Sequence, residues 1–187
     1  LSSQEQSFLE IDENLLNEVA SLVEWPRALA GGFDSTFLKV PREVLVSAMK
    51  KHQRYFHLVD NNGKLVPRFI TISNIESLDS SQVVAGNERV IRPRLADAAF
   101  FFEQDTRTSL KEKFSRLKNV VFQADLGTYA EKCERISVLA AYLAQELGIE
   151  ADTAMRAGML CKADLVSDLV GEFPDLQGTM GSYYARH

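Results

Sequence analysis

The run GNERVIRPRLADAAFFFEQD, residues 86–105, constrains the fold of this chain more than any other stretch. Pro93 has no amide hydrogen and pushes the residue before it toward extended geometry. We therefore predict one helix that ends near Ile91 and a second helix with Pro93 in its first turn. Three arginines would lie at the resulting helix–helix corner: Arg89, Arg92 and Arg94.

The second of these helices carries an apolar stripe at positions i, i+3, i+4 and i+7: Leu95, Ala98, Ala99 and Phe102. Consecutive residues are about 100° apart on a helix, so Phe100 and Phe101 cannot both share that stripe. We predict a core helix that is buried on more than one side and has a cationic entrance. The three phenylalanines are interpreted as core residues rather than as a platform for RNA bases.

Charge is segregated along the chain. Residues 1–38 carry one basic and seven acidic side chains (net −6), residues 39–118 carry fifteen and nine (net +6), and residues 119–187 carry five and ten (net −5). A basic middle favours a surface that faces a polyanion. The alternative is that the basic residues pair with their acidic neighbours.

Composition and cysteine usage indicate a cytoplasmic globular protein. No apolar run approaches the roughly 20 residues that a membrane span needs, so we expect no membrane partner. Cys133 and Cys161 form no metal-spacing motif and are interpreted as reduced thiols. The chain opens with LSSQEQS and no initiator methionine, which suggests a piece of something larger.

The first half predicts an α+β fold. Leucines and valines at helical spacing predict a helix that ends at Trp25-Pro26, and Gly31-Gly32 predicts a flexible break. Residues 37–40 are a short strand candidate before a helix that begins at Pro41. Strands at 55–59 and 65–73 flank Asn62-Gly63, a strong hairpin signal. An antiparallel hairpin or sheet packed on helices follows from this pattern.

The helix that begins at Pro41 ends in a cluster of cationic residues: Lys50, Lys51, His52 and Arg54. Cations at a helix C-terminus are favoured by the macrodipole, which is one explanation of the cluster. Phosphate contact is the other.

The second half predicts an all-α fold. Ser109 with Glu112, and Thr128 with Glu131, form capping boxes. The helix after Thr128 carries an apolar stripe, stopped by Gly148: Ile136, Leu139, Ala140, Leu143 and Leu147. Further helices are predicted over roughly 153–170 and from Pro174. A domain boundary is expected between about 108 and 125, giving an α+β domain over 1–118 and a helical domain over 119–187.

Five collinear blocks carry a family resemblance: VPREVLVSAMKKHQRYF, PRFITISNIES, GNERVIRPRLADAAFFFEQD, QADLGT and KADLVSDLVGEFPDLQGTMGSYYARH. They resemble the β subunit of the bacterial heterotetrameric glycyl-tRNA synthetase, and the chain looks like an internal fragment of it. The resemblance implies an α subunit as partner, which holds ATP and Mg and attaches glycine to tRNA(Gly). It implies that residues 1–118 are similar to the editing-type region of phenylalanyl synthetase β chains, and that 119–187 begin a degenerate, truncated HD-like domain.

An HD phosphohydrolase would need histidines and aspartates around a divalent metal. Where that family has adjacent His-Asp, this chain has Ala163-Asp164. Asp164 and Asp168 are expected to share a helix face at i, i+4, but two carboxylates without imidazole make a weak metal site. Capping, or a charge pair with Arg156 or Lys162, is the alternative role for them.

His52 and His57 lie five apart, which is unsuited to a zinc site on one helix face. We therefore expect no catalytic residue, no metal and no cofactor in this fragment.

We therefore predict that the chain functions in the recognition of RNA. The two alternatives are a scaffold for docking between subunits and domains, and a metal-dependent HD phosphohydrolase. The candidate RNA contacts are Lys50, Lys51, His52, Arg54, Arg89, Arg92 and Arg94. For Arg89, Arg92 and Arg94, internal salt bridges to Glu88, Asp97 or Glu103 are the alternative.

Overall fold

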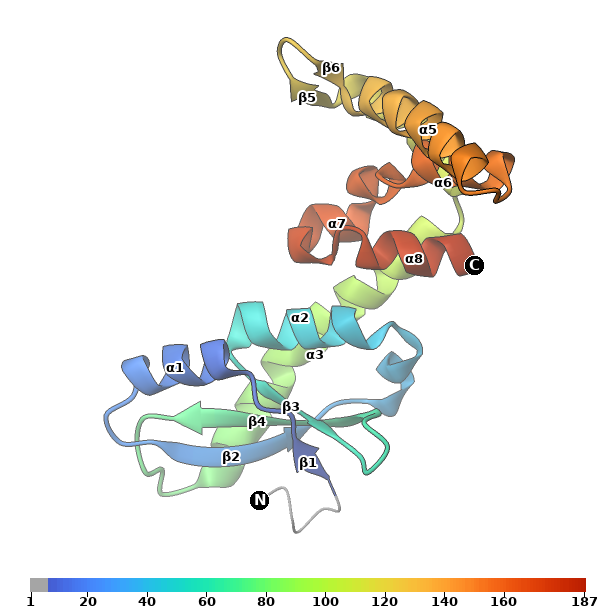
Figure 1. The fold of residues 1–187 in the computed structure, drawn as a ribbon. Coiled ribbons are helices and arrows are strands. Elements are labelled where there is room, and N and C mark those ends of the chain that lie inside the picture. The colour runs from blue at the N-terminus through green and yellow to red at the C-terminus, as the bar shows by residue number, and fades with distance from the viewer. Residues whose placement is uncertain (1–6) are drawn as a thin grey trace. The chain divides into compact units, whose positions relative to one another are not determined.

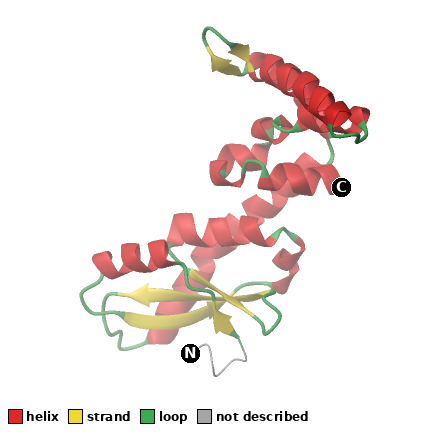
Figure 2. Cartoon of the chain, viewed as in Figure 1, coloured by secondary structure: helices red, strands yellow, loops and turns green. Residues whose placement is uncertain are grey.

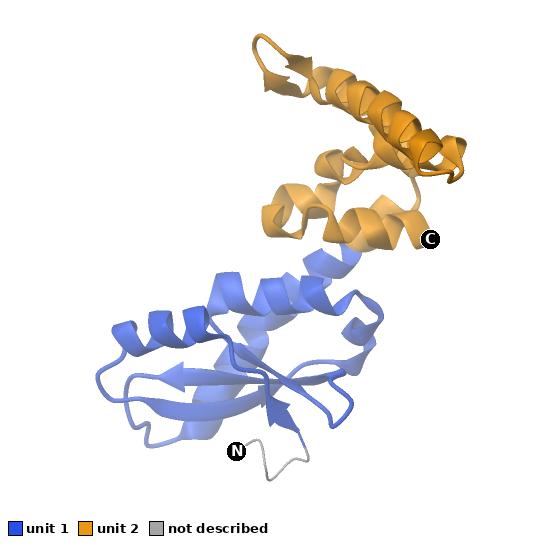
Figure 3. Cartoon of the chain, viewed as in Figure 1, with its two compact units in different colours: residues 1–100 blue, residues 101–187 orange. Residues whose placement is uncertain are grey.

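A computed structural model describes residues 7–187. The chain forms two compact units, residues 1–100 and 101–187 (Figure 3). They divide within a single helix, α3 (Ser80–Thr106), whereas the sequence interpretation placed the boundary between about 108 and 125. None of the helices in residues 7–187 combines the length and the apolar character that a membrane span requires.

The first unit contains a four-stranded sheet in which every neighbouring pair is antiparallel (Figure 2). In spatial order its strands are β1 (Phe8–Leu9), β3 (Phe56–Val59), β4 (Leu65–Ser73) and β2 (Arg27–Gly32). The predicted hairpin is confirmed as β3–β4, and its turn ends at Gly63 with a φ of 74° that favours glycine. The predicted break at Gly31-Gly32 is wrong, because both glycines belong to β2 and pair with β4.

The helices of the first unit are α1 (Glu13–Leu22), the 3-10 helix η2 (Ser35–Lys39), α2 (Arg42–Gln53) and most of α3 (Figure 1). The predicted strand at residues 37–40 is wrong. Asp34 caps a 3-10 turn there by accepting a hydrogen bond from the Thr36 amide at 2.8 Å. On one face of the sheet, Leu15 and Val19 of α1 pack against Phe56 and Ile70.

Phe69 lies on the opposite face of the sheet, because side chains alternate along a strand. It is fully buried, and its ring stacks on Tyr55 with the centroids 4.4 Å apart. The Tyr55 hydroxyl donates to Asn87 Oδ1 of α3 at 2.5 Å. This contact holds α3 against the second face of the sheet.

The predicted corner at Pro93 is wrong, because α3 runs through Pro93 without a break. Ile91, Leu95 and Ala98 are all fully buried, so the same apolar stripe continues on both sides of the proline. A proline inside a helix costs about 3 kcal/mol, and burying two large side chains offsets that cost. Pro93 itself is exposed, and so is Arg89, the residue whose carbonyl loses its amide partner.

The core interpretation of the three phenylalanines holds only in part. Phe100 is 57% exposed, whereas Phe101 and Phe102 are half-buried. Phe102 stacks on Tyr184 within the second unit, with the centroids 6.1 Å apart. Three consecutive side chains on a helix point in three different directions, and the one from Phe100 points into solvent.

The second unit is helical apart from one short ladder. Its elements are α4 (Leu110–Arg116), η3 (Leu117–Asn119), β5 (Val121–Gln123), β6 (Gly127–Thr128), α5 (Tyr129–Glu146), α6 (Ala151–Leu160), η4 (Ala163–Val166), α7 (Asp168–Glu172), η5 (Pro174–Leu176) and α8 (Thr179–Arg186). Both predicted capping boxes are confirmed, at the starts of α4 and α5. The all-α prediction missed β5–β6, and the predicted helix over 153–170 is wrong because α6 ends at Leu160.

Helix α5 is buried through small residues rather than through its leucines: Ala130, Cys133, Ser137 and Ala144. Ala130 and Cys133 pack with Leu117, whereas Ser137 faces α6. A Cβ placed on Gly158 of α6 would lie 2.7 Å from the Ser137 Cα, so the two backbones approach too closely for any side chain there. The predicted leucine stripe is therefore not the packed face: Leu139, Leu143 and Leu147 are all exposed.

Asp105 organises the second unit from within its core, where it is 4% exposed. Its carboxylate accepts hydrogen bonds from the Asp168 amide at 3.0 Å, the Leu169 amide at 2.9 Å and the Tyr184 hydroxyl at 2.9 Å. Lys113 Nζ lies 4.0 Å from the same carboxylate. One side chain thus caps the start of α7 and joins it to α4 and α8.

Candidate nucleic-acid interface

The cationic end of α2 is tied to acidic residues of the same unit. Lys50 Nζ bonds the Asp12 carboxylate, and Arg54 Nε lies 2.6 Å from Glu18 Oε1. Arg54 also ends the helix in the left-handed conformation, at a φ of 55°. Lys51 is exposed and His52 is half-buried. Lys50 and Arg54 therefore fit the alternative in which the basic middle pairs with its acidic neighbours.

The arginines of α3 are placed differently. Arg89, Arg92 and Arg94 are all exposed, and none of them forms an ion pair with any residue between 7 and 187. Two of the partners expected for them are occupied elsewhere. Glu88 Oε1 accepts from the Gly32 amide at 2.8 Å, and Glu103 pairs with Arg107 at 2.8 Å.

Helical phase divides the three arginines. At about 100° per residue, Arg89 and Arg92 lie about 60° apart on α3, whereas Arg94 lies about 160° from Arg92. Arg92 and Arg94 thus flank the buried stripe on opposite sides. The corner that would have gathered all three does not exist, so only Arg89 and Arg92 form a pair that a single ligand can meet.

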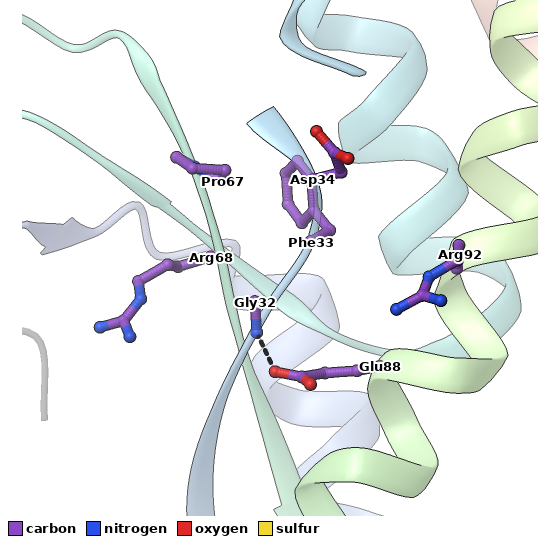
Figure 4. Close-up of a pocket in the computed structure, with 7 residues that line it drawn as sticks. All are labelled: Gly32, Phe33, Asp34, Pro67, Arg68, Glu88 and Arg92. Carbon is purple, nitrogen blue, oxygen red and sulfur yellow. Dashed lines mark hydrogen bonds between the residues drawn. The ribbon is translucent and has the colours of Figure 1, made fainter. Parts of the chain in front are cut away.

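Arg92 borders a polar pocket of about 440 Å³ in the first unit (Figure 4). Its lining comes from the end of β2, from β4 and from α3: Gly32, Phe33, Asp34, Pro67, Arg68, Glu88 and Arg92. The Phe33 amide donates to the Pro67 carbonyl at 3.1 Å, which extends the β2–β4 pairing to the edge of the pocket. Figure 4 shows that the Arg68 side chain points away from Arg92, so Arg92 supplies the cationic group on the α3 side.

Two carboxylates share this pocket with Arg92. The Thr36 amide that bonds Asp34 lowers the pKa of that carboxyl, and the nearby Arg92 charge acts in the same direction. Asp34 therefore stays ionised at neutral pH. Glu88 uses Oε1 for the Gly32 amide, and its Oε2 has no hydrogen-bond partner among residues 7–187.

Asp164, the aspartate at the expected HD position, binds backbone amides with its carboxylate. Asp164 lies in η4 and is 1% exposed, and its Oδ2 accepts from the amides of Gly178 at 2.5 Å and Gly181 at 3.0 Å. The expected shared helix face is wrong, because Asp168 begins a separate helix, α7. Its own amide donates to Asp105. In residues 7–187 there is no group of three His, Cys, Asp or Glu side chains arranged to hold a metal ion.

Sequence reasoning missed Phe33, Asp34 and Glu88 as a group. Asp34 follows a strand that was not predicted, and Glu88 was considered only as an arginine partner. Glu88 is more than fifty positions from Phe33 and Asp34, and the three meet because β2 lies against α3. The one local signal was the spacing of Glu88 and Arg92 at i, i+4, which usually indicates an ion pair.

The sequence comparisons place the chain among the aminoacyl-tRNA synthetases. The sequence model of the glycyl-tRNA synthetase beta subunit family matches residues 1–187. The chain belongs to that family.

Relatives named glycine–tRNA ligase beta subunit support the assignment. The chain is 58% identical to the one from Chromohalobacter salexigens, over 94% of its own length and 26% of the relative's. It is 54% identical to those from Pseudomonas syringae pv. tomato and Azotobacter vinelandii, over 100% and 99% of its length and 27% of each relative. The chain thus spans about a quarter of the length of these relatives.

Proposed function

We propose that this chain is a tRNA-handling part of the glycine–tRNA ligase β subunit, which acts without catalytic residues of its own. The observation that carries this proposal is the pair Arg89 and Arg92. Both guanidinium groups are exposed on one side of α3 and form no ion pair with residues 7–187, so they are available to phosphate oxygens. The α subunit would carry out the ATP- and Mg-dependent attachment of glycine, in the cytoplasm.

The finer domain assignments are part of the same proposal. The first unit corresponds to an editing-type domain that retains a binding role, and the second to the beginning of an HD-like domain. Ala163-Asp164 at the position of His-Asp supports a degenerate HD-like domain, and so does the use of Asp164 as a helix cap.

The test compares tRNA(Gly) binding by the full-length enzyme and by two matched variants. Arg89→Ala with Arg92→Ala is expected to weaken binding by about tenfold or more, because hydrogen bonds to charged groups contribute about 1.5–3 kcal/mol each. Arg54→Ala removes the same kind of charge from an arginine that is paired with Glu18, and should leave tRNA binding nearly unchanged. Equal losses in both variants would contradict the assignment of the α3 face.

A scaffold for docking between subunits or domains is the second candidate function. Val138, Leu139 and Tyr142 are each more than half exposed on one side of α5. A contiguous exposed apolar patch is a feature of protein–protein contact sites. Loss of α-subunit co-purification in Leu139→Glu, with tRNA binding retained, would favour the scaffold.

A further inference from the structure

The pocket beside Arg92 contains two opposite charges that do not neutralise each other. Glu88 and Arg92 are spaced i, i+4 on α3, where such residues ordinarily pair. They form no ion pair in the part of the chain that the structure describes. The pocket of about 440 Å³ has both residues in its lining, and Figure 4 shows the Glu88 carboxylate and the Arg92 guanidinium among its sticks.

The bond between Glu88 and Gly32 explains why the charges stay apart. Glu88 Oε1 is held by the Gly32 amide at 2.8 Å, which directs the carboxylate toward β2. The remaining oxygen, Oε2, is an acceptor without a partner in residues 7–187, and Arg92 offers a fork of donors. A ligand that meets both must present donors to Glu88 and acceptors or a flat face to Arg92.

Charge and size narrow the class of ligand. Glu88 and Asp34 place two carboxylates against one guanidinium, so a bare phosphate would be repelled inside the pocket. A free amino acid could bridge the charges, but the smallest ones would leave most of 440 Å³ to water. A nucleobase fits both requirements, because it is flat and carries donors and acceptors along one edge.

Phe33 supplies an aromatic ring on which a base in this pocket can stack. It is half-buried in the pocket lining, and unpaired bases stack on aromatic rings and on arginine guanidinium planes. Arg89 lies one turn before Arg92, outside the pocket lining, where it can meet the phosphate attached to the base.

We propose that this pocket binds one unpaired nucleotide of the RNA, and that Glu88 selects bases with an exocyclic amine. Cytosine, adenine and guanine each carry such an amine as a donor. Uracil has no amine and offers only its ring N3–H, which lies between two carbonyl oxygens that the Glu88 carboxylate repels. The inference rests on the proposed RNA-handling function and adds a base preference to it.

The test titrates the full-length β subunit with the four nucleoside 5′-monophosphates and with glycine, and follows binding by calorimetry. CMP, AMP and GMP are expected to bind about tenfold more tightly than UMP, from one base-specific hydrogen-bonding contact. In Glu88→Gln the amide oxygen can still accept from Gly32, while the amide nitrogen replaces the free acceptor by a donor. This variant should lose the preference and bind UMP more tightly than the parent protein does. Asp97→Asn removes an equal charge from α3 outside the pocket lining and is the matched control, expected to behave as the parent.

Several outcomes would overturn the inference: equal affinity for all four monophosphates, binding of glycine alone, no binding at millimolar concentration, or a preference that survives Glu88→Gln. Thermal unfolding of each variant shows whether a loss reflects misfolding. If Glu88→Gln unfolds early, Arg92→Lys replaces it, because a lysine keeps the charge and loses the planar fork. The Arg92→Lys variant should bind all four monophosphates more weakly than the parent protein does. Unchanged affinity would overturn the inference.

The two proposals fail separately. If Arg89→Ala with Arg92→Ala lowers tRNA affinity but no base preference exists, the RNA-handling function stands and the nucleotide pocket is wrong. If the monophosphates show the preference and tRNA affinity is unchanged in that double variant, the base preference of the pocket stands, whereas the RNA-handling function and the assignment of the pocket to RNA are wrong.

Discussion

Replacing Asp105 by alanine is expected to reduce the unfolding free energy of the second unit by about 3–5 kcal/mol. The substitution removes the acceptor for the Asp168 and Leu169 amides and for the Tyr184 hydroxyl, at 2.9–3.0 Å. A buried donor left without a partner costs about 1–3 kcal/mol. It also leaves Lys113, which is 1% exposed, without the carboxylate beside it.

The charge on Lys113 explains why Asp105→Ala should lower the unfolding free energy by as much as about 3–5 kcal/mol. Burial lowers the pKa of Lys113, and the negative charge of Asp105 opposes this shift. Lys113 still bonds the carbonyl oxygens of Asp105 and Thr108, at 2.5 and 2.9 Å, so it would remain in place as an uncompensated cation. Asp105→Asn keeps one acceptor and should therefore cost less than alanine.

Urea unfolding of this chain provides the assay, with two probes that separate the units. Far-UV circular dichroism follows the helices of both units, whereas the fluorescence of Trp25, the one tryptophan in the sequence, reports on the first unit alone. Asp105→Ala should move the part of the dichroism transition that comes from the second unit to lower urea and leave the Trp25 transition nearly unchanged. The same substitution at exposed Asp97 should change either transition by no more than about 0.5 kcal/mol. A loss below 1 kcal/mol in Asp105→Ala would refute the role of this carboxylate.

Three further substitutions test packing and protonation. Gly158→Ala should destabilise the second unit by about 1–3 kcal/mol, because its Cβ would lie 2.7 Å from the Ser137 Cα; a higher Tm would contradict this packing. Gly31→Ala should lower the Tm of the first unit, since its Cβ would lie 2.5 Å from Phe69 Cζ; an unchanged Tm would show that the ring yields easily. Burial lowers the pKa of His57 in the folded protein, whereas the unfolded chain keeps the ordinary histidine pKa of about 6.5. As the pH falls, His57 is therefore protonated in the unfolded chain before it is protonated in the folded protein. The unfolding free energy should therefore decline below about pH 6.5, and urea titrations of His57→Gln should show a smaller decline; equal pH dependence in both proteins would exclude His57 as its source.

Local signals predicted the elements whose determinants lie close together in sequence. Asn62-Gly63 predicted the hairpin, and the pairs Ser109–Glu112 and Thr128–Glu131 predicted two helix starts. Each of these works over two to four residues, so the surrounding fold has little opportunity to override it.

The predictions that failed depended on distant contacts. Pro93 was predicted to begin a new helix. Ile91 and Leu95 are instead buried on the same side of α3, and their burial keeps the helix continuous. The leucine stripe of α5 looked like its packed face, but Gly158 allows a closer approach along its small residues. A periodic pattern shows that a face is apolar, and only the fold shows which face is covered.

The candidate site shows the same difference between local sequence signals and contacts from distant residues. Sequence reasoning selected Arg89, Arg92 and Arg94 together as candidate RNA contacts, and it had no means of separating the pair Arg89 and Arg92 from Arg94. It also grouped Lys50 and Arg54 with them, because their acidic partners lie almost forty residues earlier: Asp12, which caps α1, and Glu18 within α1.

The salt dependence of tRNA(Gly) affinity in the full-length enzyme tests the central claim most directly. Each phosphate contact contributes about 0.7–0.9 to the slope of log affinity against log salt. Arg89→Ala with Arg92→Ala is predicted to give a slope shallower by about one to two, with an unchanged Tm. Unchanged affinity and slope, together with a lower Tm, would contradict the account and assign these arginines to the stability of the fold.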